Sequence, residues 1–314
     1  MGRARGANAA MNIAFETTYG TPPATGYRRM PFVSADIGAE RGLIESDLLG
    51  QGRNPFDPSP DVTNNDGNVV VAVDELFFGH WLKLLLGAPV TIAGNGQFLH
   101  TFDSGAAALP SLSAELAFPD VPSFSTNYGL RGSTMQLSAQ RSGLLNATIG
   151  LIGRGETVAA ATSAITTNAD IADVIRLAQM SGDVTIDGAH GGVIVAADMS
   201  FSNSLEKIEA IRPDGEIEDA DAGMPMASGS VTIAFDNNAL PLKASSNTPV
   251  SLEMRWASVT ASLTLQFGRV FLPRRKKQVS GPKGIQVKYD WIGSGEGQLP
   301  LFRALLLNKT PSYA

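Results

Sequence analysis

Few residues in the sequence have the types and the spacing that metal binding or catalysis requires. The three histidines are His80, His100 and His190, and none of them has the spacing of paired metal ligands. His80 lies in the apolar segment DELFFGHWLKLLL, which favours a side chain packed in a core over a metal ligand. The chain has no cysteine, so disulfides, thiolate metal sites and cysteine nucleophiles are excluded.

One glycine-rich segment and two charged segments are further candidates for binding chemistry. GSGEG at 293–297 follows an expected strand with no helix after it, which favours a turn over a phosphate-binding loop. The acidic residues between 216 and 221 lack the spacing of a calcium loop and favour a solvated loop. The basic run 274–277 fits either a solvated turn or a contact with an acidic surface of another subunit. We therefore predict no metal, no cofactor and no enzymatic activity.

The composition indicates a folded, β-rich chain with many turns. Of its 314 residues, 43% are apolar and only 17% are charged, and the net charge of −6 argues against a protein that wraps nucleic acid. No apolar stretch reaches the roughly 18 residues of a membrane-spanning helix. The first residues lack the apolar segment of a signal peptide, and we expect a flexible arm there.

Two segments of the chain are nearly the same. GNVVVAVD begins at residue 67 and GSVTIAFD at residue 229, and the preceding VSADI (33–37) and VAADM (195–199) have the same separation of 162 residues. Further matches keep the same order: LPSLSAELAF with TPVSLEMRWA, Arg141-Ser142-Gly143 with Val279-Ser280-Gly281, and IGRGE (152–156) with IGSGE (292–296). The collinear series predicts an internal duplication; the alternative is that β-rich segments share patterns without common descent.

Each repeat begins with two strands of alternating apolar and polar residues. The alternation places one set of side chains in a core, namely Val33, Ala35, Ile37, Met199, Phe201, Val231, Ile233 and Phe235. Long polar loops at 47–66 and 212–228 separate the paired strands. A helix follows each repeat, with Asp74 as the cap and Gly87 as the end of the first, and Asp236 as the cap of the shorter second. Two more strands close each repeat.

These elements predict a mainly β protein made of two tandem β-sandwich or partial-barrel units, each with one α-helix. The expected division is an N-terminal arm at 1–26, unit 1 at 27–157, a linker at 158–188, and unit 2 with a C-terminal segment at 189–314. The linker is rich in Ala and Thr. Its second half is expected to form a short helix with Ile171, Val174, Ile175 and Ala178 on one face.

The order of these segments resembles the major tail tube proteins of long-tailed, siphophage-type bacteriophages. The resemblance is carried by ETTYGTPPATGYRRMPFVSADI (16–37), PSLSAELAF (110–118), YGLRGSTMQLSAQRSGLLNATIGLIGRGE (128–156), DMSFSNSLEKIEAI (198–211) and SGSVTIAF (228–235). It extends from about residue 14 to 308, although no single motif is diagnostic. The family has no active site, so no catalytic residue follows from it.

The resemblance implies a structural virion protein that forms stacked rings, which make up the tail tube and conduct DNA into the host. A duplicated chain would need three copies for a pseudo-hexameric ring, with a homohexamer as the alternative. Tape measure, tail terminator and distal tail proteins are the implied partners, with transient passage of double-stranded DNA and no membrane. The implied location is the virion tail, after assembly in the bacterial cytoplasm.

Within such a tube, the polar faces of the repeated strands are expected to line the lumen, and the loops to join the rings. The lumen set is Asp36, Glu40, Ser200, Ser202, Glu206 and Thr232. The inter-ring set is Arg53, Asp57, Glu216, Glu218, Asp219, Arg274, Arg275, Lys276 and Lys277. Two alternatives stay open, a tandem β-sandwich module that binds a glycan or a host surface, and another tail or baseplate component. The aromatic content of 7% does not favour the binding module.

Overall fold

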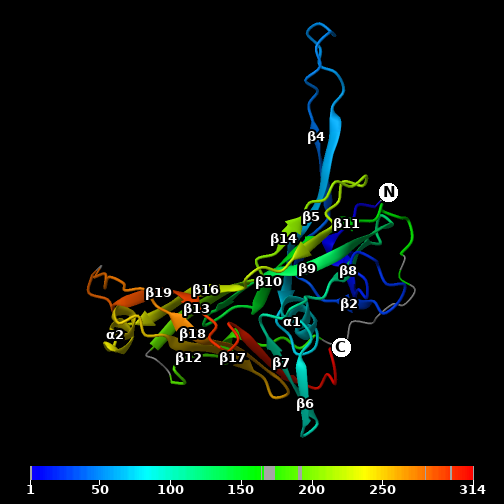
Figure 1. Cartoon of the computed structure of the whole chain (residues 1–314). Helices are drawn as coiled ribbons and strands as arrows, with labels where there is room; N and C mark the ends of the chain where they lie inside the picture. The colour runs from blue at the N-terminus through cyan, green and yellow to red at the C-terminus, as the bar shows by residue number, and fades with distance from the viewer. Residues whose placement is uncertain are drawn as a thin grey trace.

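The chain is mainly β, as the sequence predicts, with two α-helices among the described residues (Figure 1). A computed structural model describes residues 2–163, 165, 174–189, 193–279, 281–297 and 299–313. Most of the strands form an elongated body, and one long hairpin projects far from it (Figure 1). That hairpin consists of β4 (Ala39–Ile44), the first half of β5 (Ser59–Ala72) and the loop between them.

One antiparallel layer runs through both halves of the chain. Within it, β9 of the first half pairs directly with β13 of the second half. The order of its strands is β3 (Ser34–Asp36) continued by β4, then β5, β10 (Asn146–Gly153), β9 (Ser123–Ala139), β13 (Val193–Ser202), β16 (Met226–Ala234) and β19 (Gln286–Gly293).

Further strands cover one face of this layer and close the core. In the first half they are β2 (Arg28–Met30), β1 (Ala10–Phe15), β8 (Leu112–Phe118), the start of β9 and β11 (Gly155–Glu156). Over the second half of the layer they are β12 (Gly182–Ile186), β17 (Val250–Ala257), β18 (Ser262–Phe271) and β20 (Arg303–Asn308). From the first half of the chain, β7 (Gln97–Asp103) pairs with β20, and its hairpin partner β6 (Val90–Gly94) is exposed at every residue. A separate small sheet pairs β14 (Glu206–Ile208) with β15 (Asp219–Asp221). Short 3-10 turns occur at Gly6–Asn8 and Gln179–Ser181.

The two repeated strand pairs have the same register. Ala35 lies opposite Val69 in the first half, and Ala197 lies opposite Val231 in the second, at the separation of 162 residues seen in the sequence. The next ladder also repeats, because Ile152 lies opposite Asp66 and Ile292 lies opposite Ser228. A duplicated unit predicts this agreement; the common origin of the two halves stays a prediction.

The first glycine of each repeated segment allows two backbones to approach closely. A Cβ on Gly67 would overlap the carbonyl oxygen of Asp36, and a Cβ on Gly229 would overlap the carbonyl oxygen of Asp198. Because any side chain at these positions would push the two strands apart, both positions require glycine. This requirement explains why the two segments GNVVVAVD and GSVTIAFD begin with the same residue.

The predicted capping residues are correct for the first helix, α1, and wrong for the second, α2. Asp74 accepts hydrogen bonds from the backbone N–H groups of Leu76 and Phe77, just before α1 (Phe78–Leu86). Gly87 ends α1 with a φ of 92°, as expected. Before α2 (Ala239–Ser245), however, the N-cap position is Asn238 and not Asp236, and the side chain that accepts the N–H of Ala239, at 2.9 Å, is that of Asn237.

The alternation predicts most of the core correctly. Ile37, Met199, Phe201, Val231 and Ile233 are buried, and Ala35 and Phe235 are half-buried against the same core. Val33 is the exception, with 55% of its surface exposed, because it precedes β3 at the outer edge of the layer.

The predicted arm and linker each contribute a strand to a sheet. β1 lies within 1–26 and pairs with β8, and β12 lies within 158–188 and pairs with β17. Part of the predicted linker helix, including Ile171, lies outside the described residues. The described remainder, 174–178, is not helical and forms isolated bridges to the first half.

The two predicted polar loops are shorter than expected. β5 already begins at Ser59, so only 45–58 form the tip of the projecting hairpin. Within 212–228, strand β15 and the start of β16 are regular structure. Polar residues are compatible with strands at both places because these strands are exposed on at least one face.

Candidate functional site

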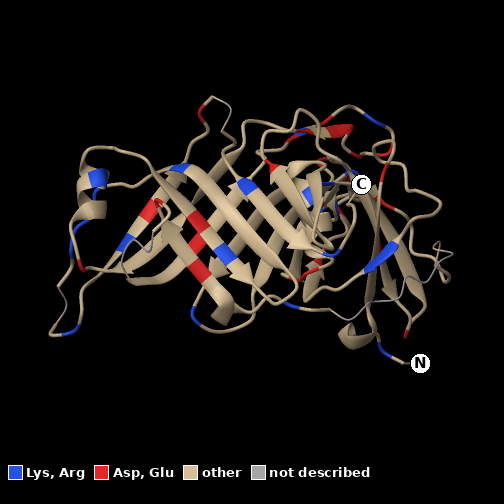
Figure 2. Cartoon of the chain, turned by 90° about the horizontal axis from the view of Figure 1, so that it is seen from below, with Lys and Arg blue, Asp and Glu red and all other residues tan. Residues whose placement is uncertain are grey.

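The face of the continuous layer that points away from the core carries small polar side chains. Its central row consists of residues that lie opposite one another on four neighbouring strands: Thr148, Gln136, Ser200 and Ser228. Gln136 and Ser228 are exposed, and the other two are partly exposed. Most strand residues of the chain are uncharged, as the tan ribbon in Figure 2 shows. We refer to the outward side of β5, β10, β9, β13, β16 and β19 as the polar face.

The one carboxylate at the middle of the polar face is held by hydroxyl groups. Ser138 donates a hydrogen bond of 2.6 Å to Asp198 Oδ1, and Ser230 donates one of 3.0 Å to Asp198 Oδ2. A shallow depression of about 530 Å³ surrounds them, with Lys288 and Asp290 at its border. Asp290 forms an ion pair with Arg275. The depression therefore combines paired charges with small hydroxyl side chains.

The predicted lumen residues divide into three groups. Ser200, Ser202 and Thr232 lie on β13 and β16 and belong to the polar face. Asp36 and Glu40 are exposed on β3 and β4, at the outer edge of the same layer. Glu206 lies outside this layer, on β14 opposite Asp221.

The sequence did not point to Gln136, Thr148 or Ser228 as members of this face. Polar residues alternate with apolar ones in GSTMQLSAQ and NATIGLIG, which was a usable signal. That these residues share one face with residues of β13 and β16 follows only from the pairing of β9 with β13, which joins segments about sixty residues apart in the chain.

Three carboxylates of the predicted inter-ring set are engaged within the chain. Glu216 accepts a hydrogen bond of 2.5 Å from the Tyr128 hydroxyl and pairs with Arg154 at 3.3 Å. Asp219 pairs with Arg131 at 3.0 Å, and Glu218 pairs with Arg212. The contacts of Glu216 and Asp219 hold the 212–221 segment against the first half of the chain, whereas the Glu218–Arg212 pair lies within the segment.

The other members of that set are exposed. Arg53 and Asp57 lie in the tip of the projecting hairpin. Arg274 and Lys276 make no hydrogen bond or ion pair within the described chain. Lys277 donates a hydrogen bond to Asn238 and lies 3.9 Å above the ring of Phe235. The role of the whole set in ring contacts stays a prediction.

The histidines are structural in the part of the chain that the structure describes. His80 and His100 are buried, as predicted for His80, and both rings pack edge-to-face with the ring of Tyr313. His190 lies outside the described residues. No group of three His, Asp or Glu side chains with metal-binding geometry occurs among the described residues.

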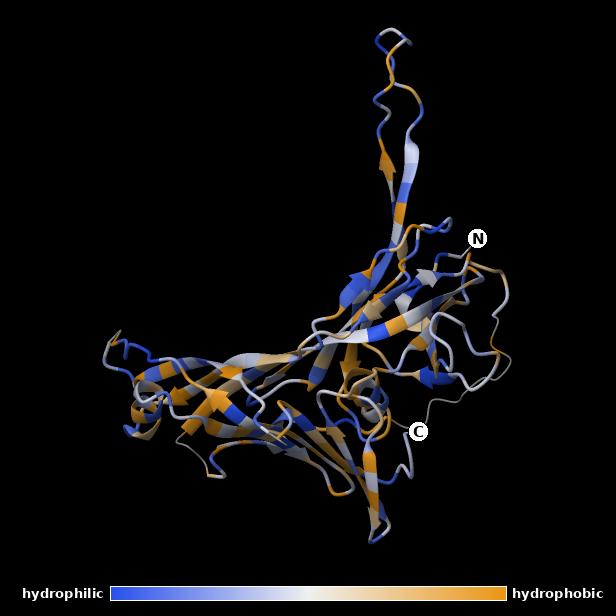
Figure 3. Ribbon diagram, viewed as in Figure 1, coloured by the Kyte–Doolittle hydropathy of each residue, from blue (hydrophilic) through white to orange (hydrophobic). Residues whose placement is uncertain are grey.

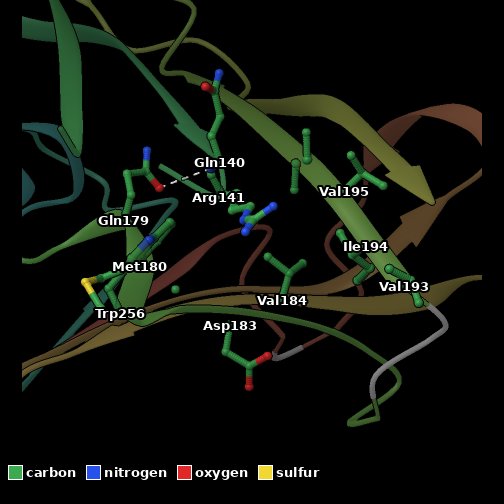
Figure 4. A pocket seen from close by; sticks show the side chains of 14 residues that line it. Gln140, Arg141, Gln179, Met180, Asp183, Val184, Val193, Ile194, Val195 and Trp256 are labelled. Carbon is green, nitrogen blue, oxygen red and sulfur yellow. Dashed lines mark hydrogen bonds between the residues drawn. The ribbon is translucent and has the colours of Figure 1, made fainter. Parts of the chain in front are cut away.

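A second cavity of about 530 Å³ opens between β12 and β13 (Figure 4). Its walls are mostly aliphatic, with Val184, Val193 and Ile194 from the two strands and Trp256 at its base. The polar contact drawn across it joins the Gln140 N–H to the side-chain oxygen of Gln179 at 3.1 Å. Its described lining also contains one guanidinium group, that of Arg141, and one carboxylate, that of Asp183.

Burial shifts the pKa values of His80 in α1 and of Asp74 just before this helix. The Nε2 atom of His80 accepts a hydrogen bond of 2.6 Å from Arg28. Burial, together with the positive charges of Arg28 and Lys83, lowers the pKa of His80 to about 3. Burial raises the pKa of Asp74 to about 6, although its carboxylate accepts two backbone N–H groups.

These shifts predict how the variant His80→Gln changes acid stability. As the pH falls from 6.5 towards 3, the unfolded chain binds a proton at His80 that the folded chain does not bind, so stability is lost by up to about 1.4 kcal/mol per pH unit. Asp74 partly offsets this loss, because between pH 6 and 3.8 the folded chain binds the additional proton. Glutamine keeps an acceptor for Arg28 and removes the titration, so the variant should gain stability relative to the wild type below pH 6.5.

Urea unfolding of the subunit between pH 8 and 4.5 measures this difference. The difference in free energy of unfolding between variant and wild type should be constant above pH 7. Below pH 6.5 it should change in favour of the variant. Parallel curves over the whole range would contradict the buried neutral state of His80.

Comparison with known families gives one decisive match. The family model of the phage tail tube protein matches residues 6–293. The chain belongs to the phage tail tube protein family. Among curated proteins, no sequence matches it.

Membership in the tail tube family identifies the chain as a structural component of the phage tail, where copies assemble into a tube. The family is structural and not an enzyme family. No helix among the described residues is long and apolar enough to span a membrane. For a tail tube protein, the relevant surfaces are those that meet other copies and those that face the channel.

Proposed function

We propose that three copies of the chain form a closed ring, and that stacked rings make a channel through which double-stranded DNA passes at ejection. The observation that carries this proposal is the single layer that crosses both halves of the chain through the β9–β13 ladder. Such a layer has two open ends, and closure into a barrel removes exposed sheet edges. Its polar face then lines the channel, while β12, β17, β18 and β20 lie on the outside.

The dimensions of a three-copy barrel suit a DNA duplex. The layer supplies seven strands per chain, with β3 and β4 counted as one. With one further strand per chain at the junction between copies, a ring has 24 strands, which at about 4.8 Å per strand and a tilt near 40° close into a barrel roughly 45 Å across. A channel surface of serine, threonine and glutamine, with few net charges, has little affinity for phosphate groups. DNA is therefore expected to slide along it.

The projecting hairpin supports a role in stacking rings. It carries β4, the first part of β5 and the tip 45–58 away from the body of the subunit (Figure 1). Leu48 and Leu49 on this tip are exposed, which favours coverage by another subunit. Arg53 and Asp57 are the proposed polar contacts at the same tip. Tape measure, tail terminator and distal tail proteins are the proposed partners at the tube ends and in its lumen, after assembly in the host cytoplasm.

Electron microscopy of the purified protein tests the proposal. We expect rings or tubes with a central channel, and native mass spectrometry of isolated rings should give three chains per ring. A hexamer with only one half of each chain around the channel would overturn the three-copy ring. Monomers that stay dispersed at millimolar concentration, in conditions where phage tails are stable, would overturn the assembly itself.

A further inference from the structure

The two ends of the continuous layer are open in the single chain. At one end, β3 and β4 pair only with β5 among the strands that the structure describes. At the other end, β19 pairs with the last two residues of β18, Val270 and Phe271, and the ladder stops there. Residues 272–279 then continue without regular secondary structure (Figure 1). All of them except Leu272 are exposed. The layer therefore contains seven strands, with β3 and β4 counted as one.

The junction between β9 and β13 shows how one half of the chain joins the next. Six consecutive residue pairs form this ladder, from Ala197 opposite Ala139 to Ser202 opposite Thr134. On the polar face, Asp198 lies opposite Ser138 and accepts its hydroxyl. The junction thus consists of an antiparallel ladder with a polar contact on the channel side.

Both partners of this junction have counterparts at the open ends. The pairing of β3 and β4 with β5 is the counterpart of the pairing of β13 with β16. Glu40 lies opposite Asn64, and the residues 162 positions later, Ser202 and Met226, also lie opposite each other. The open edge of β3 and β4 is therefore the counterpart of the β13 edge that receives β9.

The segment 272–279 is the counterpart of the second half of β9. Arg131 lies opposite Ile152 and Phe271 lies opposite Ile292, so the two segments that follow have the same length. In β9 the residue left unpaired at the bulge is Ser133, and its counterpart is Pro273. Proline inside a sheet is tolerated at bulges and edges, which makes Pro273 compatible with a strand of this kind.

We propose that residues 274–279 of one copy form a strand on the edge of β3 and β4 of the next copy, in the register of the β9–β13 ladder. This inference rests on the proposed ring and specifies its junction. Asp36 then lies opposite Gln278 of the second copy, in the place of Asp198 and Ser138. Glu40 lies opposite Arg274 of the second copy. The added strand raises the count from seven to the eight per chain that a 24-stranded barrel requires.

Charge complementarity supports a second copy of this chain as the occupant. The side chains of Asp36 and Glu40 are exposed and make no hydrogen bond or ion pair within the described chain. Arg274 and Lys276 are likewise exposed and without such a partner in the described part. In the proposed register the side chains of 36, 38 and 40 share the polar face with those of 278, 276 and 274. Opposite charges directly across a ladder stabilise the pairing.

Two contacts within the free chain must change when the strand forms. Arg275, the counterpart of the buried Met135, pairs with Asp290 on the polar face and would turn to the opposite side. The backbone N–H of Ala39 donates to Glu156 at 2.8 Å, so this carboxylate blocks the edge at one position. Protection of an open edge by a side chain is a known way to delay unwanted strand pairing. The segment is therefore expected to become a strand only in the assembled ring.

Engineered disulfides test the register directly, because the natural chain contains no cysteine. In the variant Asp36→Cys with Gln278→Cys, oxidation of assembled tubes should link the chains of each ring into covalent trimers. On a non-reducing gel, the largest product should therefore contain three chains. Two controls use the same first cysteine. Asp36→Cys with Lys276→Cys is slipped by two residues, where the Cα atoms are about 7 Å or more apart. Asp36→Cys with Lys277→Cys places the two sulfur atoms on opposite faces. Each control should give at least fivefold less covalent product.

The outcomes separate this inference from the proposed ring. Micrographs of each variant under reducing conditions show whether tubes form at all. The proposed register is overturned if tubes form normally but the test pair does not link, or if a control pair links as well as the test pair. Either result leaves the proposed ring intact. Absence of rings in the wild type as well overturns the proposed function. Covalent products that end at six chains would keep the junction and overturn the three-copy ring.

A charge exchange keeps the inference testable if the cysteine variants do not assemble. Glu40→Arg and Arg274→Glu, each alone, place like charges opposite one another and should raise the protein concentration needed for tube formation about fivefold. The double variant restores opposite charges and should return to within about twofold of the wild type. If the double variant assembles as poorly as the single variants, these two residues do not face each other and the proposed register is wrong.

Discussion

The variant Gly229→Ala should lose about 3 kcal/mol or more of its free energy of unfolding. The new Cβ atom would overlap the Asp198 carbonyl oxygen and the ring of Trp291 at the same time. Both neighbours are fixed, since Asp198 belongs to a ladder with β9 and β16, and Trp291 is buried in the core. Overpacking against backbone and a large buried ring is among the most destabilising single changes. Urea unfolding of the subunit measures the loss.

The matched control is Gly268→Ala. Gly268 also lies in a strand, β18, but a Cβ there meets no atom within 4 Å. Its replacement should change the free energy of unfolding by less than about 1 kcal/mol. Equal losses at Gly229 and Gly268 would show that close approach to Asp198 does not determine the cost.

Gly67→Ala should act differently from its counterpart. The new Cβ would overlap the Asp36 carbonyl, but Asp36 ends a strand of three residues that pairs on one side only. The edge is therefore free to shift, and unfolding should be affected less than in Gly229→Ala. The variant should reduce tube formation more than it reduces the free energy of unfolding of the subunit, because the same edge is the proposed junction with the next copy.

Introducing positive charge on the polar face should turn the proposed channel surface from one with little affinity for DNA into one that binds DNA. The variant Gln136→Lys with Ser228→Lys adds two positive charges per chain at exposed positions of the central row. Each lysine can contact a phosphate and release a counterion, so binding of DNA by the tubes should fall steeply with salt. Phage carrying the variant should assemble tails of normal length and eject DNA more slowly.

The control adds the same charge away from this face, as Thr185→Lys with Val259→Lys. Thr185 lies on β12 in the covering sheet, and Val259 is fully exposed in the turn before β18. DNA ejection in this control should match the wild type. Equal slowing in both variants, or no effect of Gln136→Lys with Ser228→Lys on assembled tails, would show that the polar face is not the path of the DNA.

The sequence determined the local features of this protein. Alternation with a period of two assigned Met199, Phe201, Val231 and Ile233 to the core, because successive side chains of a strand point to opposite faces. The repeated segments predicted two strand pairs that have the same register in the structure. Asp74 and Gly87 marked the limits of α1, because capping depends on residues within one turn of the helix end.

The tertiary structure alone decided which strand edges meet. No local pattern indicates that β9 pairs with β13, that β1 and β12 belong to the sheets, or that β7 pairs with β20 about two hundred residues later in the chain. The backbone groups of every strand edge are chemically alike, so the choice of partner depends on how the whole chain packs its apolar faces. The polar face is a product of that choice: its residues alternate in the sequence, but they form one surface only because β9 lies between β10 and β13.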